Sequence, residues 1–201
     1  MKEKIKILLN KYSISINDEN IEKLVIFAEE VIDKNKKINL ISYRDETKII
    51  ERHIMDSLMF KKFDIIANED LTLLDIGSGA GFPGIIISIV NHNLKITLAE
   101  KRIKKYMFLL WIKEKLKLKN VSIINKEILG NEGFYFDFIT QRASGKIENI
   151  HPLAMKLLKN GGYFVSWMSD NDFKKYQIQP NFIYNYYLED GIKRAICIWR
   201  K

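Results

Sequence analysis

The stretch Leu73-Leu74-Asp75-Ile76-Gly77-Ser78-Gly79-Ala80-Gly81-Phe82-Pro83-Gly84 decides the fold class of this 201-residue chain. A short apolar run leads into three glycines at alternate positions, and Pro83 suits the first turn of a helix because its φ is already close to the helical value. Glycines at such a turn let the backbone approach a ligand, and ligands of open α/β sheets bind beyond the carboxyl ends of strands. The stretch therefore predicts a buried strand, a ligand-binding turn and a helix.

The sequence on either side predicts a doubly wound α/β sheet that follows a helical segment. Apolar residues recur at helical spacing before residue 70, whereas short apolar runs alternate with helical segments after it. We expect helices at 2–11, from a cap at Asn17 or Asp18 through Ile32, and at about 46–63, 83–90, 101–118 and 147–158. We expect strands at 71–76, 94–99, 121–124, 136–140 and 162–167.

The C-terminal part predicts a different connection. The runs 182–188 and 192–199 flank Asp190-Gly191, a strong hairpin signal, so the mostly parallel sheet should end in an antiparallel pair. A dinucleotide dehydrogenase would normally add a second mononucleotide-binding half instead. We therefore expect a Rossmann-like sheet of the methyltransferase type, divided into an N-terminal helical extension, 1–68, and a cofactor-binding domain, 69–201.

Composition limits the classes of partner and compartment. The chain has 33 Lys and Arg residues against 25 Asp and Glu residues, and the net charge of +8 favours a polyanionic partner such as nucleic acid. A general compositional bias toward Lys, Ile and Asn would also produce this positive charge. Cys197 is the only cysteine, which excludes an intrachain disulfide or a cysteine-based zinc cluster and suits a reducing cytoplasm. No stretch reaches the ~18 apolar residues of a membrane span, so we expect no membrane partner. His53, His92 and His151 are far apart, and no metal site is expected.

Two cofactors compete for the glycine turn. The segment Gly79–Gly84 satisfies G-x-G-x-x-G, the dinucleotide fingerprint, but there the first glycine directly follows the strand, whereas Gly79 lies three residues past Ile76. Asp75 at the end of the strand suits a cationic or amino-bearing ligand, such as the methionyl portion of S-adenosylmethionine, and would sit poorly against pyrophosphate. The turn therefore favours a methyltransferase, with Asp75, Gly77, Gly79 and Gly81 in its cofactor site.

Glu100 is the second part of the nucleotide signature. It directly follows the second predicted strand, about twenty residues past the glycines, where a carboxylate can accept both hydroxyls of a ribose. Either cofactor contains a ribose, so Glu100 supports nucleotide binding without choosing between them. The alternative for Glu100 is a solvated ion pair with Lys104 at i,i+4.

The absence of two motifs narrows the classes of atom that could accept the methyl group. The only prolines are Pro83, Pro152 and Pro180, so the Pro-Pro-aromatic motif typical of exocyclic amino methylation is absent, and Cys197 lies in a predicted strand rather than at a nucleophile position. A ring nitrogen with a free lone pair needs only alignment with the methyl group, and alignment can remove roughly 7 to 11 kcal/mol of barrier. Arg142, after the fourth strand, suits the cofactor region or a base edge, or alternatively a surface ion pair.

Four segments together resemble the bacterial RsmG (GidB) family, the ribosomal small-subunit guanine-N7 methyltransferases. They are Lys37-Ile38-Asn39-Leu40, Arg52-His53-Ile54-Met55-Asp56-Ser57-Leu58, the stretch from Asp75 to Gly84, and Gln141-Arg142-Ala143. The resemblance implies transfer of methyl from S-adenosylmethionine to N7 of a guanine in 16S ribosomal RNA or a small-subunit precursor, by a cytoplasmic monomer. Where the family commonly has a Lys-Gly pair after the fifth strand, this chain has Trp167-Met168-Ser169-Asp170.

The resemblance also implies roles for individual residues. Gly77 and Phe82 would line the cofactor site, Glu100 would bind the ribose, and Arg142 would complete the pocket. Glu127 and Ile128 would flank the adenine. No acid or base can be named, and the candidates for positioning are Arg142, Asp56 and His53. Arg52 and Asp56 are expected to form a helix-borne pair that closes over the cofactor. His53 lies inside a helical pattern, which favours a packing residue over a catalytic base.

The segment 101–119 is predicted to form a helix with an aromatic face and a basic face. The segment contains eight basic residues and one acidic residue, interleaved with aromatic residues, and we expect its aromatic face to point to the core and its lysines to solvent, where they could contact RNA.

The second hypothesis for function is a catalytically weak, S-adenosylmethionine-binding ribosome assembly factor. A third is a nicotinamide enzyme, which would require tight binding of NAD.

Overall fold

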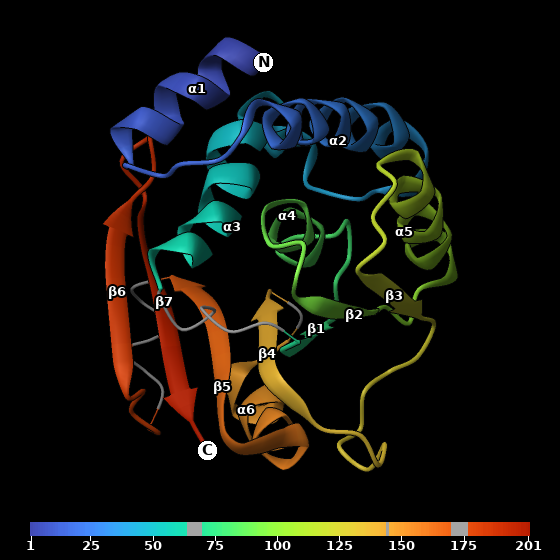
Figure 1. The fold of residues 1–201 in the computed structure, drawn as a ribbon, viewed down its shortest axis with the longest axis vertical. Helices are drawn as coiled ribbons and strands as arrows, with labels where there is room; N and C mark the ends of the chain where they lie inside the picture. The colour runs from blue at the N-terminus through green and yellow to red at the C-terminus, as the bar shows by residue number, and fades with distance from the viewer. Residues whose placement is uncertain (64–69, 144, 170–176) are drawn as a thin grey trace.

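A seven-stranded sheet forms the centre of the molecule in the computed structural model, which describes residues 1–63, 70–143, 145–169 and 177–201 (Figure 1). The strand order is β3-β2-β1-β4-β5-β7-β6. The strands are β1 Thr72–Ile76, β2 Lys95–Ala99, β3 Val121–Ile124, β4 Phe136–Arg142, β5 Leu158–Ser169, β6 Phe182–Tyr187 and β7 Lys193–Arg200. The first five run parallel, whereas β7 pairs antiparallel with both β5 and β6. The predicted fold class is therefore confirmed.

Helices flank this sheet on both faces. They are α1 Lys2–Lys11, α2 Asp18–Ile38, α4 Gly84–Val90, α5 Ile103–Lys115 and α6 Ile147–Leu157. Helix α2 begins as predicted, because the Asn17 side chain accepts a hydrogen bond from the Asn20 N–H at 2.8 Å and so caps the helix. It continues to Ile38, six residues past Ile32, and ends at Asn39 in the left-handed region, φ 49°.

The segment 43–62 differs from the single helix expected at about 46–63. It consists of a 3₁₀ turn Tyr43–Lys48, a π-helical turn Ile50–Met55, the short helix α3 Asp56–Leu58 and a second 3₁₀ turn, Met59–Lys62. Periodicity in sequence does not reveal the wider π turn, which is common near functional sites. This segment contains His53 and Asp56, so its irregular backbone bears directly on the site.

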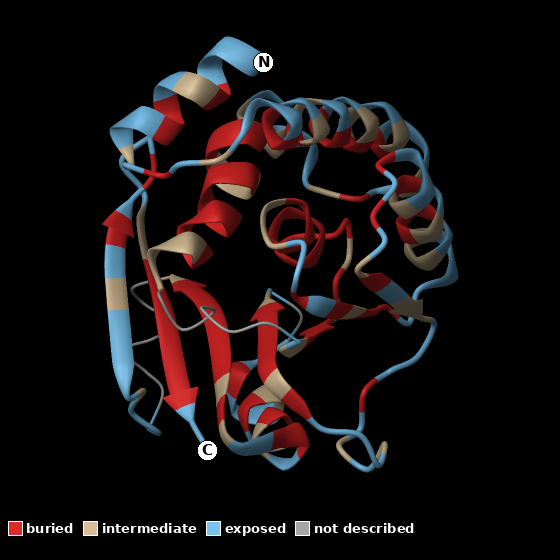
Figure 2. Ribbon diagram, in the orientation of Figure 1, coloured by how far each residue is buried: buried red, intermediate tan, exposed pale blue. Residues whose placement is uncertain are grey.

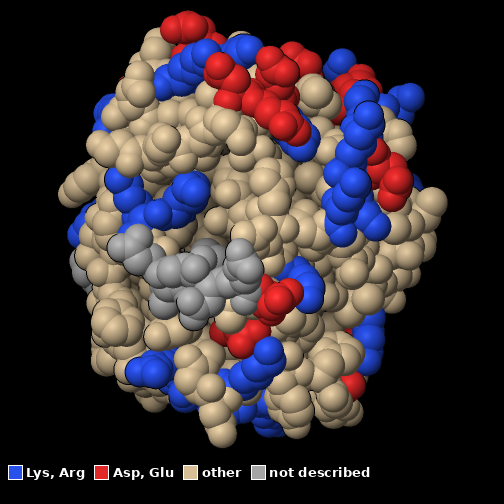
Figure 3. Space-filling model, viewed as in Figure 1, with Lys and Arg blue, Asp and Glu red and all other residues tan. Residues whose placement is uncertain are grey.

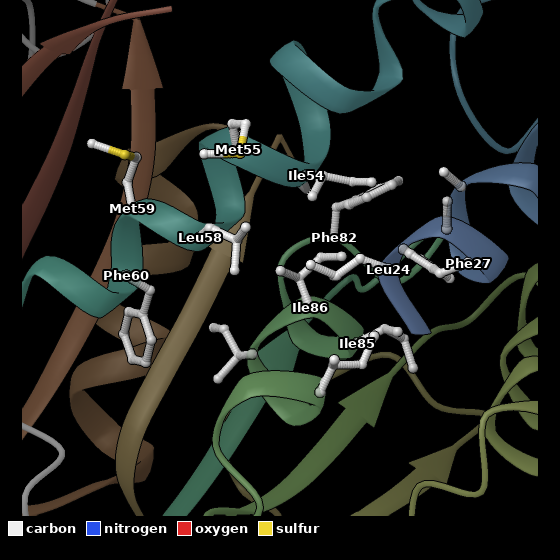
Figure 4. Packing of buried hydrophobic residues seen from close by; sticks show 14 of the residues in the cluster. Leu24, Phe27, Ile54, Met55, Leu58, Met59, Phe60, Phe82, Ile85 and Ile86 are labelled. Atoms are coloured by element: carbon white, nitrogen blue, oxygen red, sulfur yellow. The ribbon is translucent and has the colours of Figure 1, made fainter. Parts of the chain in front are cut away.

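The N-terminal helices cover the same face of the sheet as α4 and α5. Figure 2 shows that α4 and most of the central strands are buried, and Figure 4 shows Leu24 and Phe27 of α2 packing toward Phe82 and Ile85. The rings of Phe27 and Phe82 are 5.1 Å apart, between centroids. One continuous buried cluster joins these helices to the sheet, whereas α6 packs on the opposite face in a second cluster. The expected domain boundary at 68/69 lies outside the described residues.

Within the described ranges, the structure contains no helix with the length and apolarity that crossing a bilayer requires. The single cysteine, Cys197, lies in β7 and is buried.

Candidate active site

A cavity of about 360 Å³ lies where β1, β2 and β4 reach their carboxyl ends. This volume falls within the range of about 300 to 1,000 Å³ that is usual for small-molecule sites. Leu40 and Ile41, which follow α2, form part of the opposite wall. The cavity is lined by these predicted residues: Gly77, Gly79, Phe82, Glu100, Glu127, Ile128, Arg142 and His53. Asp75, Gly81 and Asp56 are not on its wall.

The glycine turn is hydrogen-bonded to the end of β2, and two of its glycines, Gly77 and Gly79, lie on the wall of the cavity. The N–H groups of Gly77 and Ser78 donate to the Ala99 carbonyl at 2.9 and 3.0 Å. Gly77 and Gly79 have φ of +67° and +58°, in the left-handed region that favours glycine. Gly81 differs, because a Cβ there would lie 2.5 Å from Ile85 Cγ1. Gly81 therefore serves the close packing of turn and helix, not the wall of the cavity.

Asp75 lies under the turn instead of in the cavity. Side chains alternate along a strand, so Asp75 points to the α4 face of the sheet while Ile76 lines the cavity. The Asp75 carboxyl accepts the Thr140 hydroxyl at 2.8 Å, and a Cβ on Gly84 would come within 2.8 Å of its other oxygen. Complete burial raises the pKa of Asp75 to about 6. The expectation that Asp75 contacts a cationic ligand is corrected: its place is that of a support beneath the turn.

Glu100 is held in place by backbone groups. One carboxylate oxygen accepts the Gly79 N–H at 2.9 Å and the other accepts the Arg102 N–H at 2.8 Å. The side chain is buried, and the alternative ion pair with Lys104 does not form in the described part of the chain. A carboxylate has about four acceptor positions, so each oxygen keeps one for a ligand. A buried carboxylate fixed at the rim of the cavity fits a pair of vicinal hydroxyls, as in a ribose.

Glu127 and Ile128 lie on the cavity wall near the end of β3. The Ile128 side chain is buried and apolar, as the face of an adenine ring requires, whereas Glu127 is exposed and pairs with Lys101 at 2.6 Å. Lys105, which the sequence did not single out, also reaches the cavity, and its Nζ donates to the Leu40 carbonyl at 3.4 Å. Burial lowers the pKa of Lys105.

Arg142 lies at the other end of the cavity in a buried polar network. Its guanidinium carbon is 5.1 Å from the centroid of the Phe82 ring, and its Nη1 donates to Asp56 Oδ2 at 3.1 Å. Its Nη2 is 2.5 Å from Nδ1 of His53. A guanidinium can only donate, so Nδ1 must accept and the imidazole must be neutral. The alternative of a surface ion pair for Arg142 is therefore wrong.

His53 cannot act as a base through Nδ1. Burial, together with the positive charge of Arg142, lowers the pKa of His53 to about 3, so the ring stays neutral throughout the physiological range. The ring centroid lies 4.9 Å from that of Phe82. The His53 side chain therefore packs against the Phe82 ring and helps to position the Arg142 guanidinium.

The expected pair between Arg52 and Asp56 does not form. Arg52 instead binds Asp45 at 2.5 Å and Asp190 at 2.9 Å, so it links the π-helical segment to the turn of the C-terminal hairpin. The wide π turn lets Arg52 point outward while Asp56 points inward. The i,i+4 spacing of these two residues suggested the pair, but that spacing assumes a regular α-helix.

Asp56 is bound by two residues that the sequence did not indicate. The Tyr186 hydroxyl donates to Oδ1 at 2.5 Å, and Arg194 Nε donates to the same oxygen at 3.2 Å. Burial alone would raise the pKa of Asp56, but Arg194, Arg142 and the Tyr186 hydroxyl together hold it below its usual value. Trp167, which stands at the position of the family's Lys-Gly pair, donates its indole N–H to the Asp56 carbonyl at 2.7 Å. Asp170 lies outside the described residues.

Helix α5 only partly follows its expected orientation. Phe108 is buried as expected and Tyr106 is half-buried, but Trp111 is 38% exposed. Met107 and Ile103 are exposed as well. The expectation that the aromatic face of 101–119 points to the core therefore holds for Phe108 and fails for Trp111. Among the described residues, no group of His, Cys, Asp and Glu side chains is placed to bind a metal ion.

The family model described as rRNA small subunit methyltransferase G (GidB) matches residues 20–183 of the chain. The chain belongs to this family. A relative of that name from Mycoplasma capricolum is 38% identical over 162 residues, which cover 79% of this chain and 69% of the relative. Another from Fusobacterium nucleatum is 36% identical over 168 residues, covering 82% and 72%. The predicted family and enzyme class are confirmed, and the nicotinamide alternative is not supported.

A solved structure described as a SAM-dependent methyltransferase from Aquifex aeolicus has a similar fold, with a TM-score of 0.56 and 17% identity over 83% of this chain and 97% of that one. At that identity the likeness shows the fold alone. Together with the family assignment, it bears out S-adenosylmethionine as the predicted cofactor of the methyltransferase.

Proposed function

We propose that this chain transfers the methyl group of S-adenosylmethionine to N7 of a guanine in 16S ribosomal RNA. The observation that carries the proposal is the layout of the cavity. A backbone-held carboxylate, Glu100, lies at one end, the glycine turn lies along the floor, and Phe82 with Arg142 lies at the other end. The curated relatives are named ribosomal RNA small subunit methyltransferase G, which supports the choice of RNA.

The proposed cofactor contacts follow from this layout. Glu100 would accept the ribose hydroxyls, and Ile128 and Glu127 would flank the adenine. The backbone at Gly77 and Gly79 would lie against the centre of the cofactor, and Phe82 and Arg142 would hold its methionyl end. Asp75 and Gly81 would act from beneath, by holding the turn in shape.

The chemistry requires positioning rather than proton transfer. S-adenosylmethionine, when bound, supplies a methyl group on a positively charged sulfur. Guanine N7 has a free lone pair, so this chain need not remove a proton before the methyl group moves. That agrees with a neutral His53 whose Nδ1 is already occupied by Arg142. Alignment alone can lower the barrier by roughly 7 to 11 kcal/mol. Asp56 would contribute by fixing the direction of the Arg142 guanidinium.

The wider setting of the reaction is also proposed. The substrate would be 16S ribosomal RNA or a small-subunit precursor, which the net charge of +8 would attract. The enzyme would work as a monomer in the cytoplasm. Residues 1–68 would form the helical extension that closes one side of the cavity, and residues 69–201 would form the cofactor-binding domain.

The proposed target atom can be tested by removing it. 16S ribosomal RNA transcribed with 7-deazaguanosine has a C–H group in place of N7 at every guanine. After assembly into small subunits, this RNA should accept no methyl group from labelled S-adenosylmethionine, while unmodified RNA should accept about one. Equal incorporation into both would exclude N7. Tight binding of S-adenosylmethionine with no transfer to any ribosomal precursor would instead favour the assembly-factor alternative.

A further inference from the structure

An apolar groove of about 410 Å³ lies between the end of α2 and the start of α5. We call it the α2–α5 groove, and it is lined by Lys34, Ile38, Ile103, Lys104, Met107, Phe108 and Trp111. Ile103, Met107 and Trp111 are spaced four residues apart, so they lie on one face of the helix. They are 58%, 55% and 38% exposed. A row of exposed apolar side chains on a soluble surface commonly marks a binding site.

Basic side chains lie beside this apolar row. The ammonium groups of Lys34 and Lys115 lie 4.9 and 5.1 Å from the centroid of the Trp111 ring, and they also pair with Asp33, at 3.0 Å, and with Glu30, respectively. Arg102 and Lys104, at the start of α5, make no ion pair within the described ranges of the chain. Figure 3 shows Lys and Arg side chains gathered in a column on the α5 side of the molecule. An aromatic ring among lysines suits a ligand with flat bases and phosphates.

We propose that the α2–α5 groove binds a single-stranded segment of the RNA substrate. One base would stack on Trp111 and pack against Met107, and the neighbouring phosphates would lie beside Lys34, Lys104 and Arg102. Single-stranded RNA is typically bound in this way, by aromatic side chains within a basic surface. This inference rests on the proposed function, because it assigns a docking place to the same substrate.

The groove adjoins the active-site cavity, because residues that are neighbours in the chain line both. Ile38 and Ile103 line the groove, while Leu40 and Arg102, two and one residues away from them, line the cavity. Lys105, on the first turn of α5, also reaches the cavity. An RNA strand that lies in the groove is therefore led toward the site of methyl transfer.

Fluorescence offers a direct test, because Trp111 is the only exposed tryptophan. The other two, Trp167 and Trp199, are 3% and 2% exposed. A single-stranded oligoribonucleotide of about a dozen nucleotides should quench the emission, as expected for stacking of a base on the ring. The quenching should disappear in Trp111→Phe, whose RNA affinity should change less than that of Trp111→Ala.

Kinetics separate RNA docking from cofactor binding. Trp111→Ala should raise KM for 16S ribosomal RNA about 5- to 150-fold, the range of a lost base–aromatic stack. Its KM for S-adenosylmethionine should not change. Lys34→Gln with Lys104→Gln should lower the slope of log affinity against log salt by about 0.7 per lysine. Lys156→Gln, on α6 across the sheet, is the matched control and should alter neither value.

The outcomes distinguish this inference from the proposed function. If methyl transfer is normal in Trp111→Ala and in the double lysine variant, with KM values equal to the control, the α2–α5 groove does not bind RNA. Sedimentation that shows a dimer dissolved by Trp111→Ala would assign the groove to a second copy of this chain, and would also overturn the inference. Quenching by RNA in a protein that transfers no methyl group would contradict the proposed function alone.

Discussion

Replacing Asp56 by Asn should strongly destabilise the protein, because Asp56 is the buried carboxylate shared by two largely buried guanidinium groups. Arg142 Nη1 lies 3.1 Å from Oδ2, and Arg194 Nε lies 3.2 Å from Oδ1. Asp56 itself is 1% exposed. Removing one partner of a buried ion pair costs about 3 to 5 kcal/mol, since the remaining charge loses its compensation. We expect a loss of this size in the free energy of unfolding.

The pH dependence of this loss has a definite sign. The pKa of Asp56 is held below its usual value, so the charged carboxylate stabilises the fold above the unfolded pKa of about 3.9 and stops doing so as pH falls through the lower folded pKa. The difference in unfolding free energy between the natural protein and Asp56→Asn should therefore stay constant from about pH 5 to pH 8. It should shrink only in more acidic solution.

Urea unfolding followed by circular dichroism measures the effect, and Tyr186→Phe provides a milder variant should Asp56→Asn fail to fold. That variant loses one hydrogen bond to a charged group, worth about 1.5 to 3 kcal/mol. Tyr187→Phe, at an exposed site on the same strand, is its control and should change stability by less than about 0.5 kcal/mol. Both Asp56→Asn and Tyr186→Phe should also weaken binding of S-adenosylmethionine through Arg142. If Tyr186→Phe and Tyr187→Phe are equally stable, the buried network does not support the fold as described.

Two further variants test the floor and the rim of the cavity. The pKa of Asp75 is raised to about 6, so the folded protein binds a proton at this residue more readily than the unfolded chain does. The stability of the natural protein relative to Asp75→Asn should therefore fall by about 3 kcal/mol as pH rises from about 4 to 7. A difference in urea unfolding that does not change with pH would contradict this. Glu100→Gln should weaken S-adenosylmethionine binding in calorimetry at least about 10-fold. The two carboxylate oxygens accept one backbone N–H each, from Gly79 and Arg102, whereas the amide of Gln has a single acceptor oxygen, so one of these hydrogen bonds is lost. Glu114→Gln, exposed on α5, is the control, and equal affinities would remove Glu100 from the site.

The order of helices and strands depended on local rules and could be predicted from the sequence. Alternation of short apolar runs with helical periodicity placed every strand within a few residues of its observed bounds, and Asp190-Gly191 marked the antiparallel hairpin. The glycine turn and Glu100 follow the ends of β1 and β2, where the sequence placed them. The segment 43–62 was not, because a π turn leaves no distinct trace in the spacing of apolar residues.

The sequence by itself determined the sheet, the edge at which the cavity lies and the family, since these depend on residues close together in the chain. Only the tertiary structure decided which charges meet. Asp56 contacts Arg142, Tyr186 and Arg194, which lie 86, 130 and 138 positions away. The strand order places β7 beside β5 and brings these side chains to α3, so their pairing depends on the assembled sheet. For the same reason Asp75, at the predicted position in β1, proved to lie beneath the turn instead of in the cavity.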